Sequence, residues 1–337
     1  VRVALNLSGR VRALAAELDI AEAQRSASVR LENPVFGGAV RTAEWGRMAE
    51  LELHQDLTQW ILRAARVDLG AVEYGVARQR IAERLLTRIT GIRVAYYELL
   101  QTHHQVATLR SSVEAAAAAH DLAQALYRAG NLSELETAKR QALYEDVRLE
   151  LAQGEVAELV DREQLNALMG LWGEQIEWRL PTQLPPLPEK KIAIEHIESR
   201  AVAHRADLLA AQMEREARTR DLTIARSERW FGGIEVGFSA EWEGGDWAVG
   251  PAVGIRLPFF GGAEVARRRA ELRRSEHALV ARAVEIRAEV RAVRERLLVA
   301  RDRARHYRDV VLPLKERIVA LVQQQYNFMI DGPFELL

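Results

Sequence analysis

The sequence contains no cysteine among its 337 residues. Disulfide frameworks, thiolate metal sites and cysteine nucleophiles are therefore excluded. An excess of one charge is also lacking, because 28% of the residues are charged but the net charge is only −1. Since a nucleic-acid-binding protein carries a basic excess on its surface, we expect no nucleic-acid partner.

Long hydrophobic runs are missing as well. No stretch approaches about eighteen consecutive apolar residues, so we expect no transmembrane helix, and the first ten residues lack the apolar core of a signal peptide. A membrane-spanning strand needs only about ten residues of alternating polarity, so a β-structured membrane segment stays open. The sequence also lacks a glycine-rich phosphate loop, a metal-spaced histidine cluster and a nucleophile triad. We therefore expect no enzyme activity, no cofactor and no bound metal.

Proline is scarce, and none of the nine prolines lies between Val35 and Leu180. This span can form very long helices, and residues 63–128 alone would make a helix of roughly 100 Å, too long for a compact globular domain. A later run of apolar residues has a mean step of 3.5, which predicts left-handed coiled-coil packing against other helices. Pro313 falls inside this run and should kink the helix or interrupt it. The run comprises Ile286, Val290, Val293, Leu297, Ala300, Ala304, Tyr307, Val311, Leu314, Ile318 and Leu321.

Two segments have the two-residue period of a strand instead. In residues 230–262, apolar side chains alternate with small or polar ones on both sides of a Glu-Gly-Gly-Asp turn, which predicts a β-hairpin with one apolar face. A weaker alternation lies between Asn33 and Leu62. Four strands are too few to close a barrel, so we expect several chains to pool their strands in a membrane. Aromatic residues at the hairpin margins would form the two interfacial girdles: Trp45, Trp230, Phe231, Trp242, Trp247, Phe259 and Phe260.

The sequence also indicates an internal repeat. When it is shifted by about 200 residues, YRAGNLSELE from Tyr127 aligns with YNFMIDGPFE from Tyr326. We expect a first repeat over residues 1–187, consisting of a helix, a β-hairpin, long helices and a tip turn near residues 128–134. The second repeat would cover residues 188–337 and be truncated at its C-terminal tip. The proline-rich stretch 180–189 would connect the two.

In their order and spacing at this doubled period, several stretches resemble the TolC family of outer-membrane efflux proteins. They are NPVF from Asn33, AYYELL from Ala95, ALMGLWG from Ala167, LPPLPE from Leu184, HRADLLAAQ from His204 and LPFFGG from Leu257. The resemblance implies a mainly α fold with a small β part. Three protomers would form a transmembrane β-barrel of twelve strands, four from each, continued by an α-barrel of long coiled-coil helices.

The resemblance also implies a location and a function. The chain would form a homotrimer in the outer membrane of a Gram-negative bacterium, in contact with outer-membrane lipid and with a large periplasmic part. It would act as a passive exit duct together with a periplasmic adaptor protein and an inner-membrane efflux pump. The stretches LMGLWGEQIEWRLP from Leu168 and YNFMIDGPFELL from Tyr326 favour pumps of the resistance-nodulation-division type, with metal ions as one candidate cargo beside drugs and proteins.

The tip turns are the first candidate site, because in this family they constrict the duct and meet the adaptor. Threefold symmetry would turn their acidic residues into carboxylate rings that attract cations, and Tyr326 would hold the gate shut through hydrogen bonds. Alternatively, Ser133 and Glu136 form only a helix capping box, with Glu335 a solvated acid in a first helical turn. Met329 stands where the first repeat has Gly130. The candidate tip residues are Tyr127, Gly130, Ser133, Glu136, Tyr326, Asp331, Gly332 and Glu335.

The polar face of the strands is the second candidate site. Glu52, Asp56, Glu235 and Glu241 would line the barrel interior, or they would simply occupy solvated strand positions. Two other functions compete with the duct. A structural coiled-coil scaffold would explain the heptads but not the strands, and a periplasmic adaptor would not duplicate the unit of helix, hairpin and helix.

Overall fold

The computed structural model describes residues 2–43, 46–181, 184–186, 196–243, 245–256, 262–329, 332 and 334. The chain divides into two units. The strand unit comprises Ala13–Leu85 and His196–Val290, and the tip unit comprises Val1–Arg12, Leu86–Glu195 and Arg291–Leu337. Three helices, α2 (Gly9–Val29), α3 (Thr58–Arg128) and α7 (Gly262–His306), contribute to both. Within the described ranges, no helix combines the length and the apolar character needed to span a membrane.

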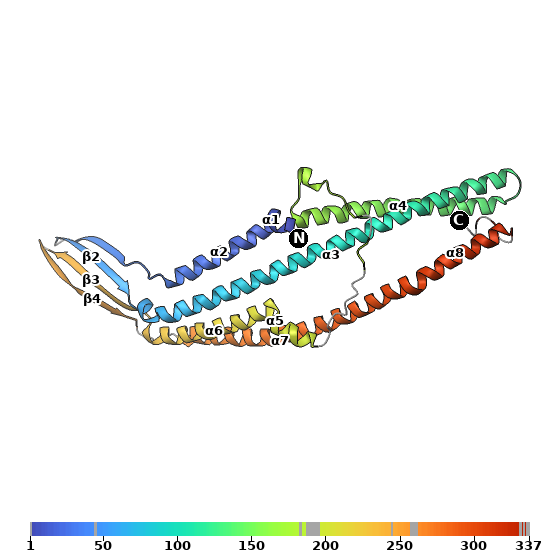
Figure 1. Cartoon of the computed structure of the whole chain (residues 1–337). Coiled ribbons are helices and arrows are strands. Elements are labelled where there is room, and N and C mark those ends of the chain that lie inside the picture. The colour runs from blue at the N-terminus through green and yellow to red at the C-terminus, as the bar shows by residue number, and fades with distance from the viewer. Residues whose placement is uncertain are drawn as a thin grey trace. The chain divides into compact units, whose positions relative to one another are not determined.

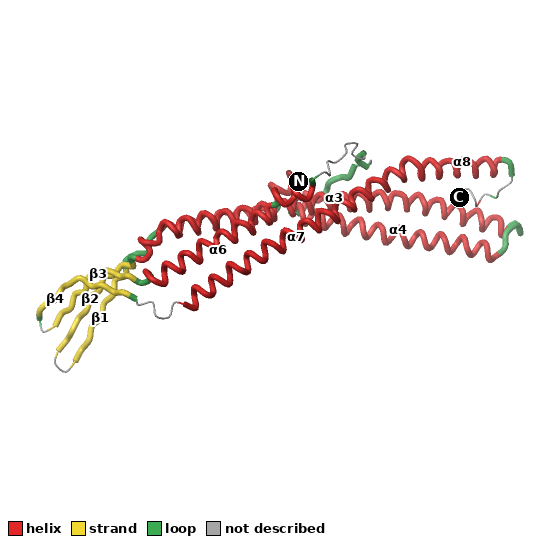
Figure 2. The backbone as a smooth tube through the Cα atoms, turned by 90° about the horizontal axis from the view of Figure 1, so that it is seen from below, coloured by secondary structure: helices red, strands yellow, loops and turns green. Residues whose placement is uncertain are grey.

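The strand unit contains one antiparallel sheet in the order β1-β2-β3-β4. Both predicted hairpins are present, and they join because β2 pairs with β3, where Leu53 lies opposite Phe238. Figures 1 and 2 show the sheet at one end of the helices α2, α3, α6 and α7. The strands are β1 (Val35–Ala43), β2 (Gly46–Asp56), β3 (Ile234–Glu243) and β4 (Asp246–Ile255), and the remaining helices are α5 (Ile197–His204) and α6 (Ala206–Phe231).

Short hydrogen bonds fix the sheet to its helices. The Thr58 hydroxyl at the start of α3 accepts the N–H groups of Gly233 at 2.8 Å and Ile234 at 3.1 Å, where α6 has just ended. The Asp56 carboxylate accepts the N–H of Thr58 at 2.7 Å. Gly237 lets β3 approach β2 closely, since a Cβ at this position would lie 2.1 Å from the Leu53 carbonyl oxygen. The start of β3 is therefore held against the start of α3 by side-chain hydrogen bonds to the backbone.

The tip unit is built around an antiparallel pair formed by the second part of α3 and α4 (Glu134–Met169). Ile92, Ala95, Leu99 and Leu165 form its buried core, against which Trp178 packs. Polar contacts extend the pairing, since His103 Nδ1 lies 2.7 Å from a Glu158 oxygen and the Thr102 hydroxyl donates to Asp161 at 2.7 Å. The other elements are α1 (Arg2–Leu7), a 3-10 turn (Gly173–Ile176), a π turn η2 (Tyr307–Val311) and α8 (Leu312–Asn327).

The predicted interruption near Pro313 is confirmed, and it takes the form of the π turn. Pro313 has no N–H to donate, and its ring crowds the carbonyl of Asp309 one turn earlier. A wider turn at Tyr307–Val311 relieves this crowding without ending the helix.

The predicted fold class, mainly α with a small β part, is also confirmed.

The predicted coiled-coil run is buried at its start and exposed farther along. Ile286 is completely buried, whereas six later members of the run are exposed: Val293, Leu297, Tyr307, Leu314, Ile318 and Leu321.

Candidate functional site

The first tip turn ends α3 in a left-handed conformation. Gly130 has φ +75° and donates its N–H to the Tyr127 carbonyl at 2.9 Å, while Asn131 donates to the Leu126 carbonyl at 2.9 Å. These two bonds are the Schellman pattern, which satisfies the last carbonyls of a helix and requires a positive φ at one residue. Gly130 is therefore required by the turn itself, whatever else the tip does.

The helix after this turn starts with a side-chain cap. The Ser133 hydroxyl accepts the Glu136 N–H at 3.2 Å, so the predicted helix cap is present. The Glu136 carboxylate does not complete a capping box in this arrangement, because it pairs with Lys139 Nζ at 2.7 Å. The hydrogen bond from Lys139 lowers the pKa of Glu136. Glu136 is thus an ionised and partly exposed carboxylate outside a complete capping box, and its part in a tip ring stays a prediction.

The second tip turn repeats the geometry of the first with a different residue. Met329 donates its N–H to the Tyr326 carbonyl at 2.9 Å and has φ +59°, although its side chain is 93% exposed. Close to this turn, the Arg140 guanidinium of α4 lies over the Phe334 ring, 4.6 Å from its centroid. Phe334, which follows α8 in the sequence, therefore contacts α4 of the same unit.

The other predicted tip residues have simpler surroundings. The hydroxyls of Tyr127 and Tyr326 make no hydrogen bond within the described part of the chain, and both rings are about half exposed. The predicted gate contact of Tyr326 therefore stays a prediction. Gly332 is exposed and belongs to no helix or strand, whereas Asp331 and Glu335 lie outside the described residues.

The strand register places Glu52, Asp56, Glu235 and Glu241 on one face of the sheet. Asp56 lies opposite Glu235, and Glu241 lies opposite Glu50, a further acidic residue that continues the same alternation and could have been predicted from it. Glu50 also pairs with Arg41 of β1 at 3.3 Å. Since Asp56 accepts the Thr58 N–H, it has a structural role at the start of α3. Whether this acidic face lines a lumen stays a prediction.

The other face of the sheet is apolar and largely uncovered. Phe238, for example, is 63% exposed, although it lies at the centre of a strand. A water-exposed sheet rarely leaves such a continuous apolar surface open, because burying it is strongly favourable. The apolar face is formed by Phe36, Val40, Leu51, Leu53, Ile234, Val236, Phe238, Trp242, Trp247, Val249, Val253 and Ile255.

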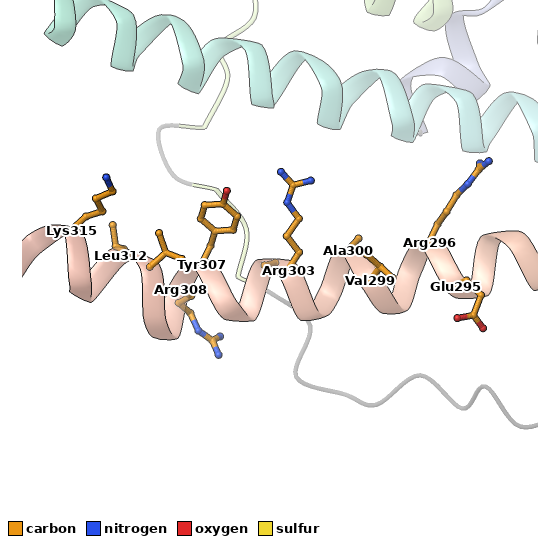
Figure 3. A pocket seen from close by; sticks show the side chains of 11 residues that line it. Glu295, Arg296, Val299, Ala300, Arg303, Tyr307, Arg308, Leu312 and Lys315 are labelled. Carbon is orange, nitrogen blue, oxygen red and sulfur yellow. The ribbon is translucent and has the colours of Figure 1, made fainter.

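A second uncovered apolar surface is an open groove along the C-terminal helices. All of its lining residues come from α7, η2 and α8, and Figure 3 shows Arg296, Arg303, Tyr307 and Lys315 extending from one side of the helix. Its apolar part includes Val299, 64% exposed, and Leu312, 56% exposed. This groove contains part of the predicted coiled-coil run.

The helices carry many acidic and basic side chains away from the tip and the sheet. Within the parts of the chain that the structure describes, no three His, Asp or Glu side chains converge as metal ligands. Several strong ion pairs join the helices of the strand unit, such as Arg66 with Glu228 at 2.9 Å and Arg80 with Glu214 at 2.6 Å. These pairs join α3 to α6, and this structural role accounts for them without a catalytic or binding function.

Solved structures share this fold, although no protein-family model and no curated protein matches the sequence. The outer membrane protein VceC from Vibrio cholerae aligns over 99% of this chain and 86% of its own, with a TM-score of 0.75 at 18% identity. The Campylobacter jejuni CmeC outer membrane channel aligns over 99% and 77%, with a TM-score of 0.75 at 14% identity. The Neisseria gonorrhoeae MtrE outer membrane channel in its open state aligns over 99% and 80%, with a TM-score of 0.70 at 15% identity. The chain therefore has the fold of these outer membrane channels, as the sequence resemblance implied.

Proposed function

We propose that this chain, which has the fold of outer membrane channels, is one protomer of a homotrimeric exit duct in the outer membrane of a Gram-negative bacterium. The observation that carries the proposal is the exposed apolar face of the four-stranded sheet. In contact with lipid this face needs no further cover, whereas in water it would favour aggregation.

The edges of the sheet support assembly from several copies. β1 and β4 are the outer strands, so each has one side that is not paired within the chain. Unpaired edges cannot face lipid, because every backbone N–H and carbonyl there needs a partner. Pairing β4 of one copy with β1 of the next would join the edges, and three copies would close a barrel of twelve strands. The strands have 9 to 11 residues, the length that a tilted membrane strand requires.

The uncovered groove on α7, η2 and α8 supports pooling of the helices as well. Four of its residues, Ala300, Ala304, Tyr307 and Val311, keep the heptad spacing of a coiled coil, yet none of them is buried in the single chain. We infer that they pack against helices of a neighbouring copy and so close an α-barrel that extends into the periplasm. The helices would then form a large periplasmic part of the duct, next to the membrane-spanning strands.

The duct would be passive and would depend on partners. We infer that it has no enzyme activity and that it works with a periplasmic adaptor protein and an inner-membrane pump. A pump of the resistance-nodulation-division type is favoured by the resemblance of the stretch from Tyr326, with metal ions as one candidate cargo. At the tip, rings of Glu136, Asp331 and Glu335 would favour cations.

The two-repeat organisation forms part of the same proposal. It is supported by the element order, in which each hairpin is followed by long helices and a left-handed turn. The turns at Tyr127–Gly130 and Tyr326–Met329 share the same backbone hydrogen bond and the same sign of φ. We place the repeats at residues 1–187 and 188–337.

The two competing functions explain less. A coiled-coil scaffold gives no reason for a sheet with an exposed apolar face, and a periplasmic adaptor gives no reason for a fold shared with outer membrane channels over 99% of the chain.

Substitution of Phe238 by Lys tests the proposal. On a lipid-facing strand near the middle of the membrane, Phe238→Lys should cost about 2–4 kcal/mol and sharply reduce the amount of trimer in the outer-membrane fraction. Ala252→Lys is the matched control, because Ala252 lies at the same level of the sheet, opposite Gly237, on the acidic face. Equal membrane recovery of both variants would contradict the assignment of the apolar face to lipid.

A further inference from the structure

Two tryptophans are exposed where the helices of the strand unit meet the sheet. Trp60 is the third residue of α3 and is 56% exposed, and Trp230 is the last but one residue of α6 and is 67% exposed. Trp242 and Trp247 lie opposite each other at the other end of β3 and β4. Aromatic residues therefore stand at both ends of the apolar strands, as they do at the two interfaces of a membrane.

Arginines follow these tryptophans in the turns nearest the sheet on three different helices. Arg269 of α7 lies farthest from the sheet, as the pairing of its neighbour Arg268 with Asp221 of α6 indicates. With a rise of 1.5 Å per residue, Arg63 lies about 8 Å beyond the sheet end of α3, Arg226 about 8 Å from that of α6 and Arg269 about 10 Å from that of α7. Arg229 lies closer to the end of α6, with its guanidinium 5.6 Å from the centroid of the Trp230 ring. We call these four exposed residues the arginine collar.

Three neighbouring acidic residues do not neutralise the arginine collar, because they pair with other arginines. Glu228 binds Arg66 at 2.9 Å, and Asp221 binds Arg268 at 2.5 Å. Glu264 binds Arg267 at 2.5 Å and Arg268 at 2.8 Å, and hydrogen bonds from both lower its pKa to about 2.

Within the described ranges, none of the four collar arginines has a carboxylate partner. Among the described residues, Arg63 donates only to the Val29 carbonyl, at 3.4 Å. The exposed Glu32 lies near Arg63 in this unit and offsets part of the positive charge of the arginine collar. The sheet end of the helices therefore carries an excess of positive charge, although the whole chain has a net charge of −1.

We propose that the arginine collar binds the phosphate groups of anionic phospholipids on the periplasmic side of the membrane. This inference rests on the proposed function, which puts the apolar strands in the bilayer. The headgroup layer on each side of the hydrocarbon core is about 5–8 Å thick, so Arg63 and Arg226, about 8 Å beyond the helix ends that adjoin the sheet, reach it with their side chains. Arg269 is the lowest member and approaches this layer from below. The order of apolar strand, tryptophan and arginine then matches the order of acyl chain, interface and phosphate.

The choice of arginine fits this ligand. A guanidinium presents two parallel N–H groups to phosphate oxygens, whereas a carboxylate partner within the protein would occupy them. The positions on three helices would give each protomer several separate phosphate contacts. Because each basic residue near an anionic surface strengthens attachment about fivefold, three of them are expected to add on the order of 100-fold.

The experiment uses the full-length trimer in detergent and tryptophan quenching by lipids with brominated acyl chains. Phosphatidylglycerol and phosphatidylcholine are titrated separately. Because the two lipids differ only in their headgroup, any difference between the two quenching curves reports the effect of the headgroup. The collar variant is Arg63→Gln/Arg226→Gln/Arg269→Gln. The matched control is Arg78→Gln/Arg215→Gln/Arg287→Gln, which removes the same charge from exposed positions on the same three helices farther from the sheet.

We expect phosphatidylglycerol to quench the parent and the control at a concentration at least about tenfold lower than phosphatidylcholine, and the collar variant to lose this preference. Equal quenching by both lipids in the parent, or an equal loss of preference in both variants, would overturn the inference while leaving lipid contact of the sheet intact. Quenching by neither lipid would instead contradict the proposed function. Displacement of phosphatidylglycerol by an equal concentration of inorganic phosphate would show a soluble-anion site and reject the lipid assignment.

Discussion

At the residue scale, the two tip turns have the same left-handed backbone conformation at different residue types. Both need a positive φ after the helix, and the chain has Gly130 in one turn and Met329 in the other. A non-glycine residue in this conformation costs about 1–2 kcal/mol, because Cβ approaches the neighbouring carbonyl oxygen. Since Met329 is 93% exposed, packing contacts of its side chain offset little of this cost. The second turn is therefore expected to be the weaker of the two.

Exchanging the residue types should have opposite effects at the two tips. Gly130→Ala is expected to destabilise the first turn by about 1 kcal/mol through φ alone, because a Cβ there meets nothing within 4 Å. Met329→Gly is expected to leave the second turn unchanged or stabilise it by up to about 1 kcal/mol. Amide hydrogen exchange of the two turns measures both effects, with about fivefold faster exchange expected for Gly130→Ala. Slower exchange at the first turn would contradict this explanation.

Residue-level features divide into those that the sequence could predict and those that it could not. The Ser133 cap and the left-handed Gly130 were predictable, because serine followed by glutamate three residues later, and glycine at a helix end, are local signals. The pairing of Glu136 with Lys139 competed with the complete capping box. The left-handed φ of Met329 was not predictable from local propensity, because methionine rarely adopts it.

At the scale of elements, Asp207 at the start of α6 connects three segments. Its carboxylate accepts hydrogen bonds from Arg205 at 2.7 Å and from Arg282 of α7 at 2.6 Å, and its side chain is only 13% exposed. Arg205 also binds Glu289 of α7 at 2.5 Å. Burial alone would raise the pKa of Asp207, but the hydrogen bonds from the two arginines outweigh it and hold the pKa below its usual value.

Asp207→Asn should therefore destabilise the strand unit in a pH-dependent way. A lowered native pKa means that the ionised carboxylate stabilises the fold above its unfolded pKa near 4, and that this contribution is lost as pH falls through the native pKa. We expect a loss of about 2–3 kcal/mol in the free energy of unfolding at pH 7, narrowing below about pH 4.

Guanidinium unfolding followed by circular dichroism at pH 7 and at pH 3 measures this loss of stability. Glu145→Gln is the control, because Glu145 forms an exposed pair with Arg148 and should change stability by less than about 0.5 kcal/mol. An Asp207→Asn effect of the same size at pH 3 and pH 7 would show that shape, and not charge, is responsible.

Element types were largely predictable, but their partners were not. The period of two located both hairpins, and the absence of proline located α3, which runs for 71 residues. Nothing local indicated that β2 pairs with β3, since this contact joins segments far apart in the sequence. The break at Pro313 was predicted, whereas its form as a π turn depends on how the backbone relieves the crowding.

At the scale of the whole molecule, the single chain leaves two of the apolar surfaces described above uncovered. The sheet exposes an apolar face and two unpaired edges, and the C-terminal helices expose a heptad groove. One arrangement covers all of them, with three copies joined at their strand edges and helices while lipid covers the sheet. The predicted acidic residues Glu52, Asp56, Glu235 and Glu241 would then share the face opposite the lipid.

The most direct test of this account is electron microscopy of the full-length protein extracted in detergent from its membrane. A helix of 71 residues is about 105 Å long, so the account predicts a hollow particle with threefold symmetry and a length of more than about 100 Å. A solid rod or a compact particle would contradict the shared barrel and make a coiled-coil scaffold the better explanation of the helices.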